Sequence, residues 1–184
     1  STQWGLFALV AVTTLLPFGA LPFRLGFRPT FLDAVMVVLV FVWLARIATR
    51  QHGPLEITPP GWPLLLFVIL AVAAFVAGLA HARPTANVLR HFAEILLAVS
   101  LFFIVVNSVR SRGQLGAIAL VIIACGFLQS AIAVALYFIP NDWTIRILSA
   151  LGRFDYPTGS AVLRWIEDNP EMPLRATGTA IGPN

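Results

Sequence analysis

The amino-acid sequence predicts an all-α integral membrane protein, with about five transmembrane helices followed by short interfacial or extramembrane helices. Hydrophobic residues make up 59% of the 184 residues and charged residues only 11%, whereas a soluble domain carries roughly a quarter charged residues. The mean hydropathy is +0.88, so lipid is the expected solvent for much of the surface. The apolar runs lack the alternation of barrel strands, and helices satisfy their own backbone in lipid.

Five apolar segments approach the length of about 20 residues that a helix needs to cross a bilayer. The spans are expected at residues 2–18, 30–47, 62–80, 87–109 and 115–139. Residues 1–139 are therefore interpreted as a transmembrane helical bundle. The first segment could pass for a signal-peptide core, but it lacks a basic leader, so it is counted as a span. Because the chain starts with Ser1, it is expected to be processed or to begin inside a longer product.

Residues 140–184 are interpreted as an extramembrane or interfacial segment that leads toward a sixth span. Asn141 or Asp142 is expected to cap a short helix that lies flat on the membrane. The apolar positions of this helix fall on one predicted face: Trp143, Ile147, Leu148 and Leu151. A second short helix is expected from Ser160 to Asp168, before Pro170.

The basic residues are all arginines and give a net charge of +4. Arginines near the predicted span ends number four on each side, so simple counting does not decide the orientation. Arg110 and Arg112 lie in a short loop without acids, which favours a cytoplasmic N-terminus and an extracytoplasmic C-terminal segment.

Motifs for soluble-type chemistry are missing from the sequence, including nucleotide-binding loops, nucleophile elbows and zinc-binding helices. The single cysteine, Cys125, lies in an apolar run and is interpreted as a small core residue. We therefore expect no metal, no cofactor and no nucleic-acid partner, and membrane lipids as the immediate surroundings.

A first set of candidate residues lies at the start of the fourth span. Arg90 and Glu94 are spaced i,i+4, and His91 and Glu94 i,i+3. The two basic residues could hold a phosphate at this helix start. Alternatively, Glu94 neutralises its neighbours and the arginine extends to the lipid headgroups. The structural interpretation has more support here.

A second candidate pair is Arg24 and Arg28, which flank Gly26 between the first two spans. Two guanidinium groups suit a diphosphate, and they equally suit the anchoring of a loop on anionic lipid. Asp33 is interpreted as a helix-start charge. Gln129 and Ser130 interrupt the fifth span, where hydrogen bonding between helices is a better explanation than substrate contact.

The third candidate is the polar end of the chain, where Arg175 is followed by Gly178, Pro183 and Asn184. A fixed cation with exposed backbone N–H groups and threonine hydroxyls could cradle an anion. A plain turn before another helix is an equally good interpretation from the chemistry alone.

The order of these features resembles the N-terminal part of the O-antigen ligase/polymerase superfamily. The resemblance is carried by residues 28–33, which open the second span, residues 89–96 and 106–110, which bound the fourth, and the motif of residues 175–184. The superfamily consists of bacterial envelope glycosyltransferases that transfer glycans from a polyprenyl-diphosphate carrier to an acceptor. Only Arg175, Gly178, Pro183 and Asn184 map onto a family motif.

The resemblance implies a location in the bacterial inner membrane and a role for Arg175 at the carrier diphosphate, with weaker roles for Arg24, Arg28, Arg90 and His91. It also implies a fragment or short relative, because the family's large extracytoplasmic loop with its main catalytic residues is missing from the sequence. The alternative is a non-catalytic transmembrane subunit or assembly factor that packs against other membrane subunits. A transporter is a third class, but it would need broken helices or midplane charges.

Overall fold

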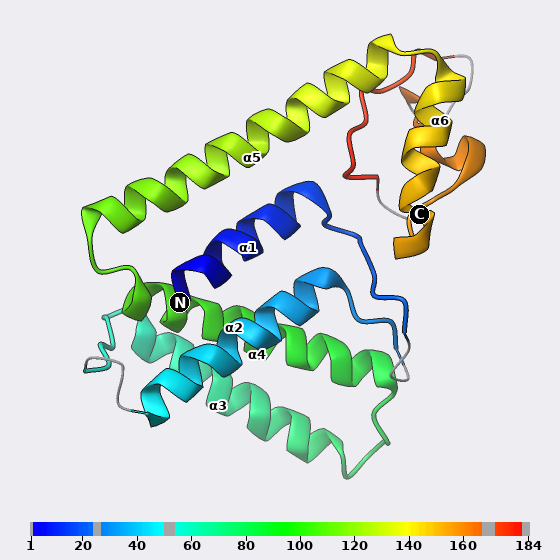
Figure 1. The fold of residues 1–184 in the computed structure, drawn as a ribbon. Helices are drawn as coiled ribbons and strands as arrows, with labels where there is room; N and C mark the ends of the chain where they lie inside the picture. Colours follow the sequence, from blue (N-terminus) through cyan, green and yellow to red (C-terminus); the bar gives the residue numbers. More distant parts are fainter. Residues whose placement is uncertain (1, 24–26, 50–53, 167–171, 182–184) are drawn as a thin grey trace. The chain divides into compact units, whose positions relative to one another are not determined.

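The computed structural model describes residues 2–23, 27–49, 54–166 and 172–181, which form six α-helices and two 3-10 helices (Figure 1). The α-helices are α1 (Thr2–Leu15), α2 (Phe31–Ala48), α3 (Gly61–Gly78), α4 (Ala86–Ser108), α5 (Arg112–Phe138) and α6 (Asn141–Ser149). The 3-10 helices are η1 (Ala150–Phe154) and η2 (Gly159–Val162). The described residues contain no β-strand, so the prediction of an all-α fold is confirmed.

Four of these helices, α2 to α5, are long and apolar enough to cross a membrane. Large apolar side chains are exposed along them, including Phe41, Ile69 and Phe127. Lipid is the natural solvent for such a surface, and the chain is therefore an integral membrane protein. The first predicted span is shorter than expected: α1 has 14 residues, about 21 Å of helix, against the roughly 30 Å of the hydrocarbon core.

Side-chain caps explain where several of the helices begin. The Asp33 carboxylate accepts from the Thr30 backbone N–H at 2.8 Å, and the Thr30 hydroxyl accepts from the Asp33 N–H at 3.1 Å. This reciprocal pair is a capping box at the start of α2, which confirms Asp33 as a helix-start residue. Thr85 caps α4 by accepting from the Val88 N–H. Ser111 and Gln114 cap α5 in the same reciprocal way.

Tertiary contacts divide the chain into two compact units. The first unit contains the chain up to Leu6 together with Val35–Leu115, and the second contains Phe7–Ala34 together with the chain from Gly116 onward. In the first unit, the rings of Phe75 on α3 and Phe92 on α4 stack with their centroids 4.2 Å apart.

The first unit also contains a close approach at Gly5. A Cβ atom at this position would lie only 2.6 Å from the Leu39 side chain of α2. Leu39 is buried, and the Arg46 guanidinium near the end of α2 donates to the Thr2 hydroxyl at 3.1 Å. Glycine at position 5 therefore lets the start of α1 pack directly against α2.

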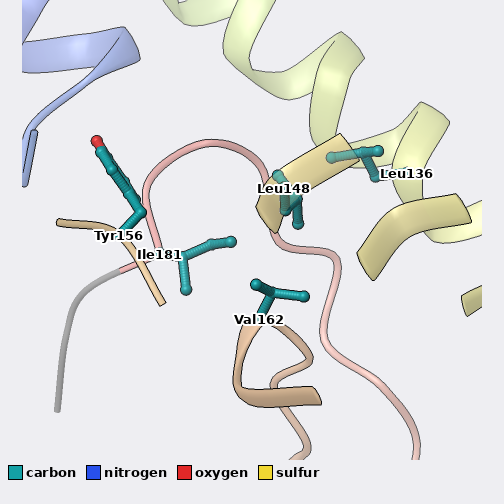
Figure 2. Packing of buried hydrophobic residues seen from close by; sticks show 5 residues of the cluster. All are labelled: Leu136, Leu148, Tyr156, Val162 and Ile181. Carbon is teal, nitrogen blue, oxygen red and sulfur yellow. The ribbon is translucent and has the colours of Figure 1, made fainter. Parts of the chain in front are cut away.

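The second unit has its own hydrophobic core, in which the segment after α5 packs against the end of that helix. The core consists of Leu136, Leu148, Tyr156, Val162 and Ile181. Figure 2 shows the side chains of Leu148, Val162 and Ile181 pointing toward one another. These residues come from α6, η2 and the end of the described chain, so the polar segment after α5 folds around an apolar centre.

Three predictions for this segment are wrong. The face of α6 that packs inward carries Thr144 and Leu148, whereas Trp143 and Ile147 are 58% and 48% exposed, so the four apolar positions do not share one environment. Pro140, and not Asn141 or Asp142, is the residue before α6, and it makes no side-chain cap. The inward face is determined by Thr144 and Leu148, which lie one helical turn apart. Burial of these two side chains in the core sets the rotation of α6 about its own axis, and this turns Trp143 and Ile147 outward.

The second short helix is also not formed as predicted. Only Gly159–Val162 is helical, as η2, and Trp165 instead pairs with Leu174 in an isolated antiparallel bridge. The turn of η2 places Val162 in the core, where it is buried. Beyond this turn, the backbone of residues 164–166 forms hydrogen bonds with residues 173–175 and does not continue as a helix. The remaining residues of that predicted helix, 167 and 168, lie outside the described residues.

Candidate functional site

The residues that carry the family resemblance lie partly in the terminal segment, residues 172–181. This segment is held at its start by backbone hydrogen bonds to residues 164–166. The Ile166 N–H donates to the Pro173 carbonyl at 3.1 Å, and the Arg175 N–H donates to the Arg164 carbonyl at 2.7 Å. The backbone of Arg175 is thereby fixed, while its side chain remains exposed.

The side-chain amide of Gln129 on α5 holds the terminal segment further along. The amide NH₂ donates to the Thr179 hydroxyl at 2.8 Å, and the amide oxygen accepts from the N–H groups of Thr179 and Ala180 at 3.2 and 3.1 Å. The Thr179 hydroxyl in turn donates to the Leu15 carbonyl at the end of α1, at 2.5 Å. This carbonyl is one of the groups that a helix leaves without an internal partner at its C-terminus. One amide therefore connects α5, α1 and the terminal segment.

Gly178 has a steric role in this connection. A Cβ atom at position 178 would lie 2.6 Å from a terminal atom of the Gln129 side-chain amide and 3.3 Å from the Gln129 backbone oxygen. Any larger residue would push the segment away from α5. The structure therefore gives a packing reason for this motif glycine, and the interpretation of Gln129 as a structural hydrogen-bonding residue is the better one.

Gln129 lies nine residues before the end of α5, which corresponds to about 14 Å along the helix axis. That position is inside the stretch of α5 that is apolar enough to cross the membrane. Non-helical backbone is tolerated at such depth only where protein satisfies it. The hydrogen bonds from Gln129 provide this, and Gly178 and Ile181 are buried.

Arg175 lies beside the end of α5. It lines a small cavity of about 20 Å³ with Tyr137, Asn141 and Thr144, which offers room for about one water molecule. Thr144 is itself tied to the helix end, because its hydroxyl donates to the Leu136 carbonyl at 3.1 Å. Within the described residues, the Arg175 guanidinium forms no salt bridge. The result is an exposed cation on a fixed backbone where a membrane helix ends.

Arg28 has a different environment, because it forms an ion pair with Asp155. The loop that carries Arg28 is docked on η1 by several contacts. The Ala20 N–H donates to the Phe154 carbonyl at 2.8 Å, and the rings of Phe31 and Phe154 meet edge to face with centroids 5.2 Å apart. The arginine therefore helps to fasten this loop to the segment that follows α6 in the second unit.

Arg90 and His91 share one acidic partner in the first unit. The Arg90 Nε lies 2.8 Å from one carboxylate oxygen of Glu94, and the His91 Nδ1 lies 3.0 Å from the other. Glu94 is thus used by both basic side chains, as the structural interpretation expected. An incoming phosphate would have to compete with this carboxylate.

Tyr156 is a buried residue that no sequence pattern indicated as functional. Its hydroxyl lies near the backbone of Phe18 and Gly19 without meeting hydrogen-bond geometry. Burial raises the pKa of this hydroxyl above its ordinary value of 10.0, and the nearby backbone groups oppose the shift. A phenol in such a place is neutral at physiological pH and contributes mainly packing.

The remaining predicted site residues, Arg24, Pro183 and Asn184, lie outside the described residues. In the part of the chain that the structure describes, no three histidine, cysteine, aspartate or glutamate side chains come close enough to hold a metal ion. Sequence reasoning selected Gln129 and the terminal segment separately but missed their contact. The spacing of 50 residues between Gln129 and Thr179 leaves no local pattern from which to find it.

Comparisons of the chain with protein-family models, with curated proteins and with solved structures find no match.

Proposed function

We propose that this chain is part of a membrane glycosyltransferase that transfers a glycan from a polyprenyl-diphosphate carrier to an acceptor, in the bacterial inner membrane. In this proposal the N-terminus is cytoplasmic and the terminal segment lies on the extracytoplasmic side. Arg175 binds the diphosphate of the carrier. The single observation that carries the proposal is the position of Arg175, an exposed arginine on a fixed backbone beside the end of a membrane-spanning helix.

The location suits a lipid-linked diphosphate. The hydrocarbon part of such a carrier lies in the bilayer, so its diphosphate is held at the boundary where α5 ends. Arginine binds phosphate oxygens through two parallel N–H donors. The other described candidates are already engaged, since Arg28 pairs with Asp155, and Arg90 and His91 pair with Glu94.

The chemistry needs a cation at this place. An acceptor hydroxyl attacks the anomeric carbon, the bond from that carbon to the diphosphate oxygen breaks, and the hydroxyl proton is released. Negative charge therefore grows on the departing diphosphate. A donor that is already in place when the charge develops stabilises the transition state without reorganisation. The pairing of residues 173–175 with 164–166 and the hydrogen bonds of Gln129 provide that fixed frame.

The test is glycan transfer by the full-length gene product with Arg175→Ala, in membranes supplied with a polyprenyl-diphosphate-linked glycan. We expect a loss of about 100-fold or more, as for the removal of one transition-state donor. Arg175→Lys should restore only part of the rate, because lysine cannot form the two parallel bonds. Arg153→Ala is the matched control, since Arg153 lies over the Phe154 ring in the same extramembrane part. Unchanged transfer by Arg175→Ala would remove this residue from the mechanism.

A non-catalytic transmembrane subunit is the second candidate, and the ion pairs favour it. Three of the basic residues considered for the diphosphate already contact acidic side chains within the chain, as expected for a purely structural role. This function predicts a stoichiometric membrane partner on gentle purification, and no binding of a short polyprenyl diphosphate to the purified chain. Binding that is lost in Arg175→Ala would instead favour the transferase.

A further inference from the structure

The first unit contains a cavity of about 460 Å³ that the proposed function does not use. Its longest wall is one face of α4, formed by Leu96, Val99, Ser100, Phe103 and Asn107. The remaining lining comes from α2, α3 and residues 55–57. The volume is within the range of sites for small molecules, which are mostly apolar with a few polar groups.

The cavity is polar at one end only. Asn107, in the last turn of α4, holds the backbone of Glu56: its amide oxygen accepts from the Glu56 N–H at 2.8 Å, and its NH₂ donates to the Glu56 carbonyl at 3.1 Å. Arg110 is fastened beside them, because its guanidinium donates to the Pro54 carbonyl at 2.9 Å and to the Asn107 carbonyl at 3.0 Å. Glu56 therefore lines this end of the cavity, and the Arg110 guanidinium lies next to it, bound to the backbone of residues 54 and 107.

The rest of the α4 wall is nearly all apolar and runs toward the middle of the helix. From Asn107 to Leu96 is eleven residues, or about 16 Å of helix. Its one polar side chain, Ser100, is already satisfied, since its hydroxyl donates to the Leu96 carbonyl at 2.8 Å. Because α4 is long and apolar enough to cross the membrane, the cavity extends from the membrane boundary toward the bilayer centre.

We propose that this cavity holds one hydrocarbon chain of a glycerophospholipid with a zwitterionic phosphoethanolamine headgroup. The apolar length takes the chain, while Glu56 faces the ammonium and Arg110 the phosphate. A further helix is too large for the space, since a cylinder 10–12 Å wide and about 16 Å long needs more than twice the volume. The site does not depend on the transferase proposal, because none of the residues that line it has a role in that proposal.

The first experiment fills the cavity. The purified full chain is reconstituted in vesicles with equal phosphatidylethanolamine and phosphatidylglycerol, extracted in mild detergent, and analysed by native mass spectrometry for retained lipid. Val99→Trp should lower the retained lipid about tenfold, equivalent to 1.4 kcal/mol of binding free energy. The control is Ile95→Trp, one turn away on α4, where the side chain is 45% exposed and does not line the cavity.

Ser100→Phe is a second filling variant, in case Val99→Trp does not fold, and thermal unfolding in detergent checks all three proteins. If the correctly folded filling variants retain as much lipid as Ile95→Trp, the chain-binding site is wrong. The headgroup is tested separately with Glu56→Gln. The unmodified chain should retain phosphatidylethanolamine about fivefold over phosphatidylglycerol, and Glu56→Gln should lose this preference. Equal retention of both lipids by the unmodified chain would overturn the headgroup assignment.

Discussion

Two amide side chains in membrane helices, Asn107 on α4 and Gln129 on α5, both form hydrogen bonds with non-helical backbone, each in a different unit of the molecule. Asn107 is buried and binds the N–H and carbonyl groups of Glu56. Gln129 is half-buried and binds the N–H groups of Thr179 and Ala180 together with the Thr179 hydroxyl. In both places, a primary amide offers a donor and an acceptor to backbone that has no helical partner.

The difference between the two lies in what each amide positions. Asn107 fixes residues 54–57 beside a large apolar cavity, and it is deeply buried near a helix end. Gln129 fixes the segment that follows the exposed Arg175, and it lies well inside its helix. A polar residue in an apolar span is therefore better understood from the irregular backbone that it satisfies than as a substrate contact.

The largest effect is expected for Asn107→Leu. This change leaves the N–H and carbonyl groups of Glu56 without their partner, and it should lower the free energy of unfolding by about 2–3 kcal/mol. The measurement is denaturant unfolding in detergent, with hydrogen exchange at the Glu56 amide as the local readout. Ser108→Ala is the control, because the Ser108 hydroxyl is buried and has no hydrogen-bond partner among the residues that the structure describes. If Asn107→Leu lowers the free energy of unfolding no more than Ser108→Ala does, the proposed role of Asn107 is wrong.

Gln129→Leu is expected to have a smaller effect, about 1–2 kcal/mol, because the segment that it releases is partly exposed. The amides of Thr179 and Ala180 should exchange faster while those of α5 stay protected. Ser130→Leu, at the exposed neighbouring position, should leave both quantities unchanged. Gln129→Leu should also reduce transfer activity, because the backbone that follows Arg175 is no longer held in place. Equal exchange of the Thr179 and Ala180 amides in Gln129→Leu and Ser130→Leu would show that Gln129 does not hold the terminal segment.

Gly178→Ala should cost about 1 kcal/mol, since the new methyl group would displace the Gln129 amide. The comparison is sharpened by a double-mutant cycle with Gln129→Ala. Once the amide is gone, the methyl group has space, so the two costs should not add. Additive losses in thermal unfolding would show that the glycine is needed for a reason other than this close approach.

The smallest effect is expected at Tyr156 and depends on pH. Burial raises the pKa of the Tyr156 hydroxyl in the folded chain, so the folded state binds this proton more tightly than the unfolded state does. The contribution of this hydroxyl to the free energy of unfolding is fully present below pH 10, the pKa of tyrosine in the unfolded chain. It is lost as the pH rises through the higher pKa of the folded chain. Tyr156→Phe should remove this alkaline loss of stability. At pH 7 it should raise the free energy of unfolding by about 1 kcal/mol or less, because the buried hydroxyl has no hydrogen-bond partner within the described part of the chain. Denaturant unfolding of the unmodified chain and of Tyr156→Phe at pH 7 and pH 11 tests both the gain at pH 7 and the missing loss at pH 11.

Much of the fold could be predicted from local features. The apolar runs placed α2 to α5 within a few residues, because the transfer of each side chain into lipid depends on that residue alone. Asp33 could be predicted as a helix-start residue for the same reason, since a cap involves only the first turn. The end of α1 and the turn at η2 could not, because neither is determined by composition within its own segment.

The sequence by itself determined that this is an all-α membrane protein and that Arg175 and Gln129 are unusual polar residues for it. Only the tertiary structure decided which of the basic residues are neutralised and which backbone each amide holds. Asn107 and Glu56 are 51 residues apart, and Gln129 and Thr179 are 50 residues apart. Pairs of this kind form when unsatisfied backbone groups meet in the folded chain, and hydrophobic pattern alone carries no information about which groups meet.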